Sequence, residues 1–199
     1  PSDHPLNVGM LGMHGNYGPN ILTNECDVLI AIGMRFDDRV TGNLATYAKQ
    51  AKVIHFEIDP AEVDKNVKTD VAVLGDVKES LAALLPLVEA KSHEAWHNEF
   101  KEKYKIELES VINDELNPKG EGISMGETIE MINKHSNGDA IMVSDVGQHQ
   151  MFTCRYSKFN QSKSNITSGG LGTMGFALPA AIGAKMGQPD REVVAIIGD

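Results

Sequence analysis

Two segments near the end of the chain hold residues suited to binding a charged ligand. Small and apolar residues fill positions 168–183, and an apolar stretch of strand length follows and ends at Gly198 and Asp199. A turn of small residues that leads into a helix lets backbone amides approach a diphosphate, and an acid at a strand end suits a divalent metal ion. The pattern predicts a site for a metal-bound diphosphate, although Asp199 alone could be an ordinary turn residue.

A second polar turn follows the apolar stretch 140–144. It reads Val-Gly-Gln-His-Gln over residues 146–150. Open α/β sheets bind ligands at the carboxyl ends of their strands, which is where this turn would lie. His149 could act there as a general acid or base or orient a substrate carbonyl, and it could equally be a structural histidine.

Charged residues follow the earlier apolar stretches in the same way. Residues 35–39 read Arg-Phe-Asp-Asp-Arg and come directly after the stretch 28–33. They could form a surface ion-pair cluster, or the arginines could hold the diphosphate of a dinucleotide. Glu57, Asp59 and Asp76 end the next two stretches and could accept hydrogen bonds from ribose hydroxyls. Their common edge favours the nucleotide interpretation.

Glycine recurs at every third position from Gly9 to Gly18. So short a run without proline cannot form a collagen helix. Because glycine lets the backbone approach a flat or anionic ligand closely, the run predicts a loop able to contact a ligand.

Apolar runs of strand length alternate with helical patterns along the chain. The predicted strands are 28–33, 52–59, 71–76, 140–144, 165–168 and 192–197, and the predicted helices are 77–89, 92–116 and 124–135. Pro86 should shorten the first of these helices, and Ser124 with Glu127 has capping-box spacing at the start of the last. This alternation predicts an α/β fold: parts of two doubly wound parallel-sheet domains joined by a long helical connection.

Composition excludes several classes of partner. The chain has 199 residues and a net charge of −10 without a basic stripe, which argues against nucleic-acid binding. No segment predicts a membrane span or a signal peptide. Cys26 and Cys154 lack a ligand spacing and are expected to be small buried residues, so a reducing, cytoplasmic location is predicted. His93 and His97 lie one helical turn apart, but without a third ligand a solvated helix face is favoured over a metal site.

Five segments together resemble the catalytic subunit of acetohydroxyacid synthase, also called acetolactate synthase. They are residues 9–15, 35–42, 55–60, 147–150 and 168–175, in this order. The resemblance extends over essentially the whole chain. It is specific, because the Arg-Phe-Asp-Asp-Arg sequence is not expected in relatives such as glyoxylate carboligase or pyruvate decarboxylase.

The resemblance implies a thiamine-diphosphate enzyme with Mg²⁺ and a non-redox FAD. Residues 1–90 would be the latter part of a central FAD-binding domain, 91–120 a helical linker, and 121–199 the first part of a thiamine-diphosphate-binding domain. Gln148, His149 and Met174 are the implied catalytic residues, since the methionine would support the bent cofactor. The thiamine diphosphate would contact Val146, Gly147, Gln148, His149, Gly172 and Met174, with Asp199 as a metal ligand. FAD would contact Leu11, Gly12, Met13, His14, Gly33, Met34, Arg35, Asp37, Arg39, Val40, Glu57, Ile58 and Asp76.

The implied reaction belongs to the synthesis of valine, leucine and isoleucine. The thiazolium ylide attacks the keto carbon of pyruvate, CO₂ leaves, and the resulting enamine attacks a second pyruvate or 2-ketobutyrate to give a 2-acetohydroxy acid. The family also implies a homodimer or homotetramer and a small regulatory subunit.

Two functional elements of this family are expected outside the present sequence. The glutamate that activates the cofactor in this family, and the asparagine end of the metal motif, do not fall within these residues. The sequence is therefore expected to be a piece of a longer chain and to be inactive alone. Another thiamine-diphosphate carboligase, a 2-keto acid oxidase or decarboxylase, and a non-catalytic nucleotide-binding module remain alternatives.

Overall fold

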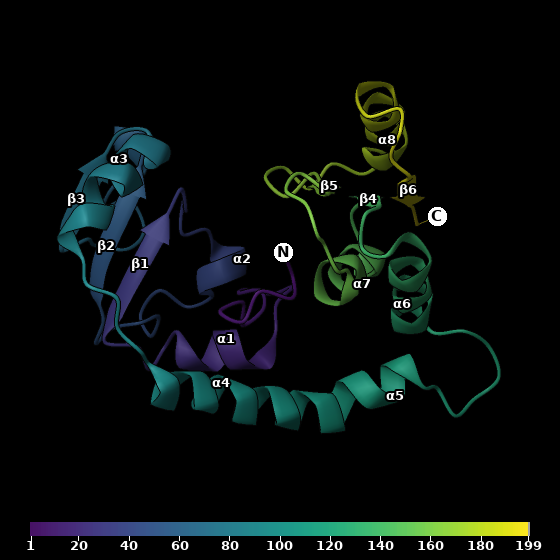
Figure 1. Ribbon diagram of the computed structural model, residues 1–199, viewed down its shortest axis with the longest axis horizontal. Coiled ribbons are helices and arrows are strands. Elements are labelled where there is room, and N and C mark those ends of the chain that lie inside the picture. The colour runs from purple at the N-terminus through teal and green to yellow at the C-terminus, as the bar shows by residue number, and fades with distance from the viewer. Residues whose placement is uncertain (199) are drawn as a thin grey trace. The chain divides into compact units, whose positions relative to one another are not determined.

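The computed structural model describes residues 1–198 (Figure 1). The predicted metal ligand Asp199 lies outside the described residues. The chain forms two compact units, one made of Gly18–Phe100 and the other of Pro1–Tyr17 with the chain from Lys101 onward. Each is described by itself, and the predicted division into domains at residues 90 and 120 stays a prediction.

The Gly18–Phe100 unit contains a three-stranded parallel sheet in the order β1-β2-β3. Its strands are β1 (Val28–Ile32), β2 (Lys52–Glu57) and β3 (Val71–Leu74), within the three predicted apolar runs. The other elements are α1 (Tyr17–Leu22), whose first residue belongs to the other unit, α2 (Asp38–Thr41), the 3₁₀ turn η1 (Pro60–Glu62), α3 (Val77–Leu84) and the 3₁₀ turn η2 (Leu85–Leu87). Pro86 lies in η2, so the predicted shortening of the helix 77–89 is confirmed.

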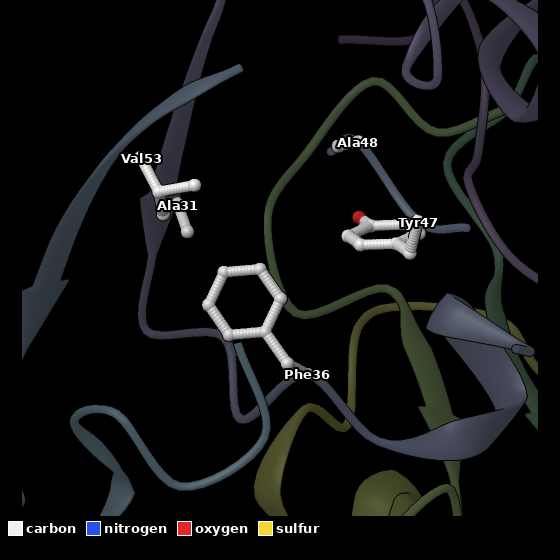
Figure 2. Close-up of a cluster of buried hydrophobic side chains, with 5 residues drawn as sticks. All are labelled: Ala31, Phe36, Tyr47, Ala48 and Val53. Carbon is white, nitrogen blue, oxygen red and sulfur yellow. The ribbon is translucent and has the colours of Figure 1, made fainter. Parts of the chain in front are cut away.

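A small aromatic cluster packs against this sheet. Figure 2 shows the ring of Phe36 between Tyr47 and the pair Ala31 and Val53, all of them buried. The Phe36 ring meets the Tyr47 ring edge-on at 6.4 Å and the His55 ring at 5.1 Å. Phe36 has φ 51°, a strained value for a residue with a side chain, and its burial offsets that cost. The packing fixes the start of the segment 35–39 at the end of β1.

Tyr47 supplies a stability prediction. Its hydroxyl is buried and has no hydrogen-bond partner within residues 1–198, and burial raises its pKa to about 12. We expect Tyr47→Phe to stabilise the protein at pH 7 by about 1 kcal/mol, because it removes an unsatisfied buried group. In the wild type the unfolding free energy should stay constant up to about pH 10 and then fall towards pH 12. The reason is that the Tyr47 hydroxyl has a higher pKa in the folded state than in the unfolded state, so above pH 10 only the unfolded state releases the proton readily. Urea unfolding from pH 7 to 12 tests both; a Tyr47→Phe protein with the same alkaline loss as the wild type would contradict the assignment.

The second unit contains a parallel sheet in the order β5-β4-β6. Its strands are β4 (Ile141–Ser144), β5 (Asn165–Thr167) and β6 (Val193–Ile196). Its helical elements are α4 (Glu94–Glu107), which begins in the other unit, the π-helical turn η3 (Leu108–Ile112), α5 (Asn113–Leu116), α6 (Met125–Ser136), α7 (Gln148–Tyr156) and α8 (Ala177–Gly187). Ser124 caps α6 by accepting the Glu127 N–H at 3.0 Å, as predicted. The predicted helix 92–116 begins two residues later, at Glu94, and is then helical without a break to Leu116, but it contains the unforeseen π turn.

Helices cover both faces of this second sheet. Met142 on β4 packs with Ile129 of α6 and Tyr156 of α7, whereas Ile141 and Val143 pack against α8 on the opposite face (Figure 1). All four β4 residues are buried, which explains why Ile141, Met142 and Val143 are apolar in succession. The doubly wound arrangement expected for this part of the chain is therefore confirmed. Across the described residues no helix is both long and apolar enough to cross a membrane.

Candidate functional site

The first turn of α7 is built to receive an anion. Its N-cap is Gly147, which has no side chain with which to cap the helix, and no acid lies in the first turn. The first backbone N–H groups of a helix have no partner within the helix and carry a partial positive charge. A phosphate at this position would accept hydrogen bonds from the Gln148 and His149 N–H groups, whereas the Gln150 N–H already donates to the Gly147 carbonyl at 3.1 Å. Gln148 and Val146 lie at this helix start, as the sequence predicted.

The glycine turn 168–175 has an open backbone. Two hydrogen bonds to Ser168 hold the turn together. The Ser168 carbonyl accepts the Gly172 N–H at 2.8 Å, and its Oγ accepts the Thr173 N–H at 3.0 Å. Gly172 has φ 62° and Gly175 φ 80°, values that favour glycine, and a Cβ atom at either would meet nothing within 4 Å. Met174 is 76% exposed and projects from this turn. The turn can therefore approach a ligand closely along its backbone.

Asp145 joins the two turns. It is buried, and its Oδ1 accepts the Val146 N–H at 3.0 Å while its Oδ2 accepts the Gly175 N–H at 2.9 Å. One carboxylate thus holds the start of the 146–150 turn beside the end of the glycine turn. Asp145 was not singled out from the sequence, although it directly follows β4, just as the acids that were singled out lie at strand ends.

Gln150 makes a second hydrogen bond that fixes the start of α7. Its side chain is buried in α7, and Nε2 donates to Thr167 Oγ1, at the end of β5, at 2.7 Å. The segment containing Gln150 was recognised from the sequence, but this residue was not assigned a role. Together Asp145 and Gln150 connect the turn after β4 to Gly175 in the glycine turn and to Thr167 at the end of β5.

The His149 ring lies against Gly147 and against Gly198, the last described residue. A Cβ atom added at Gly147 or at Gly198 would come within 2.8 Å of His149 Cε1, so both glycines are needed for this ring position. Its Nε2 is buried without a hydrogen-bond partner among residues 1–198. An orphaned buried nitrogen in the first turn of a helix fits a bound polar ligand such as a thiamine diphosphate. The consecutive residues Val146 to His149 lie at the start of α7, and Asp145 links them to Gly175, the residue after Met174 in the glycine turn.

The predicted flavin residues of the Gly18–Phe100 unit share one sheet edge. Gly33 donates its N–H to the Phe56 carbonyl at 2.8 Å, and Gly75 donates to the Glu57 carbonyl at 3.0 Å. The carboxyl ends of β1, β2 and β3 therefore coincide, as expected for Gly33, Glu57 and Asp76. Met34, Arg35, Ile58 and Asp59 follow the same strand ends, and Val40 lies on α2.

The charged residues at this edge also have structural partners. Arg35 Nε lies 3.3 Å from Asp37 Oδ2, so the predicted ion pair forms, and Asp37 caps α2 by accepting the Arg39 N–H at 3.1 Å. Glu57 Oε1 accepts two backbone N–H groups, and Asp76 caps α3 through one oxygen. One oxygen of Glu57 faces His55 Nε2 at 3.6 Å. Helix capping and backbone hydrogen bonds therefore account for part of the conspicuous acids at this edge. The exposed guanidinium of Arg35 and the open space beside Gly33 fit a flavin nucleotide.

The remaining predicted flavin residues lie in the segment 10–17 of the other unit. Leu11 and His14 are half-buried, Gly12 is buried with φ 94°, and Met13 is 52% exposed. Met13 and His14 line a small pocket with four residues of α7: Met151, Phe152, Arg155 and Tyr156. The glycine-rich run is therefore an ordered loop that lies on α7.

Neither a metal cluster nor a reactive thiol is formed by residues 1–198. No group of three or more potential metal ligands occurs in this part of the chain, which includes His93 and His97. Cys26 and Cys154 are half-buried rather than buried, and burial raises the pKa of both thiols. Neither thiol is therefore prepared for nucleophilic attack.

Comparison with known proteins identifies the family. Residues 1–84 match the thiamine pyrophosphate enzyme central domain, and residues 145–199 match the thiamine pyrophosphate enzyme C-terminal TPP-binding domain. The chain is 44% identical to the acetolactate synthase large subunit of Lactococcus lactis, with all of this chain and 34% of that protein aligned. It is 41% identical to acetolactate synthase isozyme 3 large subunit of Escherichia coli, over all of this chain and 35% of that protein.

The similarity extends to an archaeal protein. The chain is 44% identical to the probable acetolactate synthase large subunit of Methanocaldococcus jannaschii, again over its full length and 34% of the relative. The chain spans about a third of the length of the curated relatives it matches. The chain belongs to the thiamine pyrophosphate enzymes, and over its whole length it is similar to the large subunit of acetolactate synthase.

Proposed function

We propose that the full-length protein containing this chain is an acetolactate synthase. It would condense two pyruvates, or pyruvate and 2-ketobutyrate, with loss of CO₂ in branched-chain amino-acid synthesis. The observation that carries the proposal is the Asp145-linked pair of turns in a chain whose relatives are named acetolactate synthases. Thiamine diphosphate supplies the carbanion chemistry of such a reaction.

The described residues have distinct tasks in this proposal. The first turn of α7, with Val146 to His149, holds the diphosphate through backbone N–H groups, and His149 Nε2 bonds the cofactor or a substrate carbonyl. Gln148 lies beside the reacting atoms, and Met174 supports the bent cofactor from the Gly172 turn. Asp199 would bind Mg²⁺ together with the diphosphate.

FAD is proposed as a structural, non-redox cofactor. In the Gly18–Phe100 unit its contacts would be Gly33, Met34, Arg35, Asp37, Arg39, Val40, Glu57, Ile58 and Asp76. In the other unit they would be Leu11, Gly12, Met13 and His14. Residues 1–90 and 121–199 would accordingly belong to the flavin-binding and thiamine-diphosphate-binding domains, with 91–120 as a linker.

The proposal also covers the oligomeric state of the full-length protein, its partner subunit and its location in the cell. The relatives are named large subunits, which supports a small regulatory partner, and we propose a homodimer or homotetramer of the full-length protein in the cytoplasm. Gel filtration with light scattering, with and without a candidate small subunit, tests this part.

The product formed from pyruvate tests the activity. We expect the full-length protein with thiamine diphosphate, Mg²⁺ and FAD to release acetolactate and CO₂ without consuming oxygen. Acetaldehyde or acetyl phosphate would instead indicate a decarboxylase or an oxidase, and no turnover with neither cofactor bound would indicate a nucleotide-binding module. The 199-residue chain alone is the negative control and should form no acetolactate.

A further inference from the structure

Glu107 is a buried acid that belongs to none of the recognised segments. Only 3% of its side chain is exposed, and its Oε2 accepts the Tyr17 backbone N–H at 3.0 Å. Its Oε1 lies 3.5 Å from Asn16 Nδ2 and 3.3 Å from Arg155 Nη2. A buried carboxylate requires such partners, so the burial of Glu107 depends on the segment that ends at Tyr17.

Arg155 connects the same segment to α7. Its Nη2 donates to the Gly15 carbonyl at 2.7 Å and also faces Glu107. Hydrogen bonds from a charged group are stronger than neutral ones, and a guanidinium can serve two acceptors in fixed geometry. Glu107 and Arg155, which we call the loop clamp, therefore hold Gly15, Asn16 and Tyr17 from two different helices.

Anchoring these three residues fixes the whole loop, because the loop is closed on itself. The Asn16 N–H donates to the Met10 carbonyl at 2.8 Å, and Asn16 Oδ1 accepts the Met10 N–H at 3.0 Å. A further bond joins the Gly15 N–H to the Gly12 carbonyl at 2.9 Å. Residues 10–16 thus form a loop closed by hydrogen bonds between Met10 and Asn16, and the loop clamp binds its last two residues, Gly15 and Asn16.

The clamp also lies at an unusual point of its helix. Glu107 ends α4 and directly precedes the π-helical turn Leu108–Ile112. Single π turns within α-helices are rare and occur frequently at functional sites. The backbone irregularity and the buried acid together mark this position as more than a packing contact.

We propose that Glu107 and Arg155 are positioning residues for flavin binding, and that they act by ordering residues 10–17 before the flavin arrives. The inference rests on the proposed flavin contacts at Leu11, Gly12, Met13 and His14. A preordered loop loses less conformational freedom on binding, so the clamp raises affinity without touching the flavin. Neither residue takes part in the condensation itself.

Hydrogen exchange of the apo, full-length protein tests the ordering step. Glu107→Gln keeps the size of the side chain but leaves one acceptor oxygen where three donors point, from Tyr17, Asn16 and Arg155, so the clamp opens. We expect exchange in a peptide spanning residues 10–17 to accelerate about tenfold or more, with little change in a peptide spanning β4. The FAD dissociation constant, measured by flavin fluorescence, should rise by about tenfold, while the product from pyruvate at saturating FAD stays the same.

Two further variants separate a clamp from a general loss of stability. Glu130→Gln removes a matched carboxylate that pairs with Lys158 at 3.3 Å on the same unit and should alter neither readout. Arg155→Gln changes a side chain that is 30% exposed and keeps the test open if Glu107→Gln folds poorly. The double variant should lose less than the sum of the single losses, since the two side chains act through one another.

The outcomes distinguish this inference from the proposed function. A wild-type protein that binds no FAD would overturn the flavin assignment and with it the role of the clamp. A wild-type protein that binds FAD, with Glu107→Gln and Arg155→Gln binding it equally well, would overturn the clamp alone. Faster hydrogen exchange throughout the unit in both variants would show that the Glu107–Arg155 pair stabilises the whole unit rather than the loop. That result would also overturn the proposed role of the loop clamp.

Discussion

Replacing Asp145 by asparagine should weaken the activation of the full-length enzyme by thiamine diphosphate about tenfold to a hundredfold. Each Asp145 oxygen accepts one backbone N–H, from Val146 and from Gly175. Asparagine has one acceptor oxygen, and its NH₂ group would face the second donor. A buried unsatisfied donor costs about 1–3 kcal/mol, which the protein regains only by letting the two turns move apart. Both turns belong to the proposed diphosphate site, so the loss should appear as weaker cofactor affinity.

The dependence of acetolactate formation on thiamine diphosphate concentration measures this effect. The maximal rate should fall less than the affinity, and FAD binding should not change, because Asp145 contacts neither the proposed flavin residues nor the loop clamp. Asp114→Asn is a matched control, since that carboxylate is 72% exposed and 3.6 Å from Lys119. Equal activation constants for Asp145→Asn and the wild type would show that the bridge does not position the turns.

Local signals in the sequence predict most of the secondary structure. Apolar runs bounded by glycine or acids mark the strands, and Ser124 marks the start of α6, because strand burial and helix capping depend on neighbouring residues. The same locality explains the ambiguity at Asp37 and Asp76. Both cap helices, and an acid that accepts backbone N–H groups has the same sequence signature as one that accepts a ribose hydroxyl.

Contacts between distant residues could not be predicted in this way. Glu107 meets Tyr17 across 90 positions and Arg155 meets Gly15 across 140, and no periodicity indicates such pairs. The π turn after Glu107 is likewise invisible in a pattern that reads as one amphipathic helix. Asp145 differs from these, because it follows a strand directly and the rule that selected Glu57 would have found it.

Gly15 should be the least replaceable position of the glycine-rich loop. A Cβ atom there would lie 2.2 Å from the Met10 carbonyl oxygen and 2.7 Å from the Leu11 carbonyl carbon. Both are backbone atoms of the closed loop, so no side-chain rotation relieves the overlap. Gly15→Ala should therefore break the Asn16 to Met10 bond, release Gly15 from Arg155 and destabilise this unit by about 2–3 kcal/mol.

The Gly15→Ala variant should also lose FAD affinity more severely than Glu107→Gln, because it opens the loop itself rather than its anchor. Urea unfolding and FAD titration of the full-length protein measure the two losses. Gly120→Ala is the control, since a Cβ atom at that glycine meets nothing within 4 Å and its φ is not positive. If Gly15→Ala matched Gly120→Ala in both measurements, the close approach of Gly15 to Met10 would have no part in ordering the loop. If it lost stability but kept its FAD affinity, the loop would be structural only, and the flavin contacts proposed for residues 11–14 would be wrong.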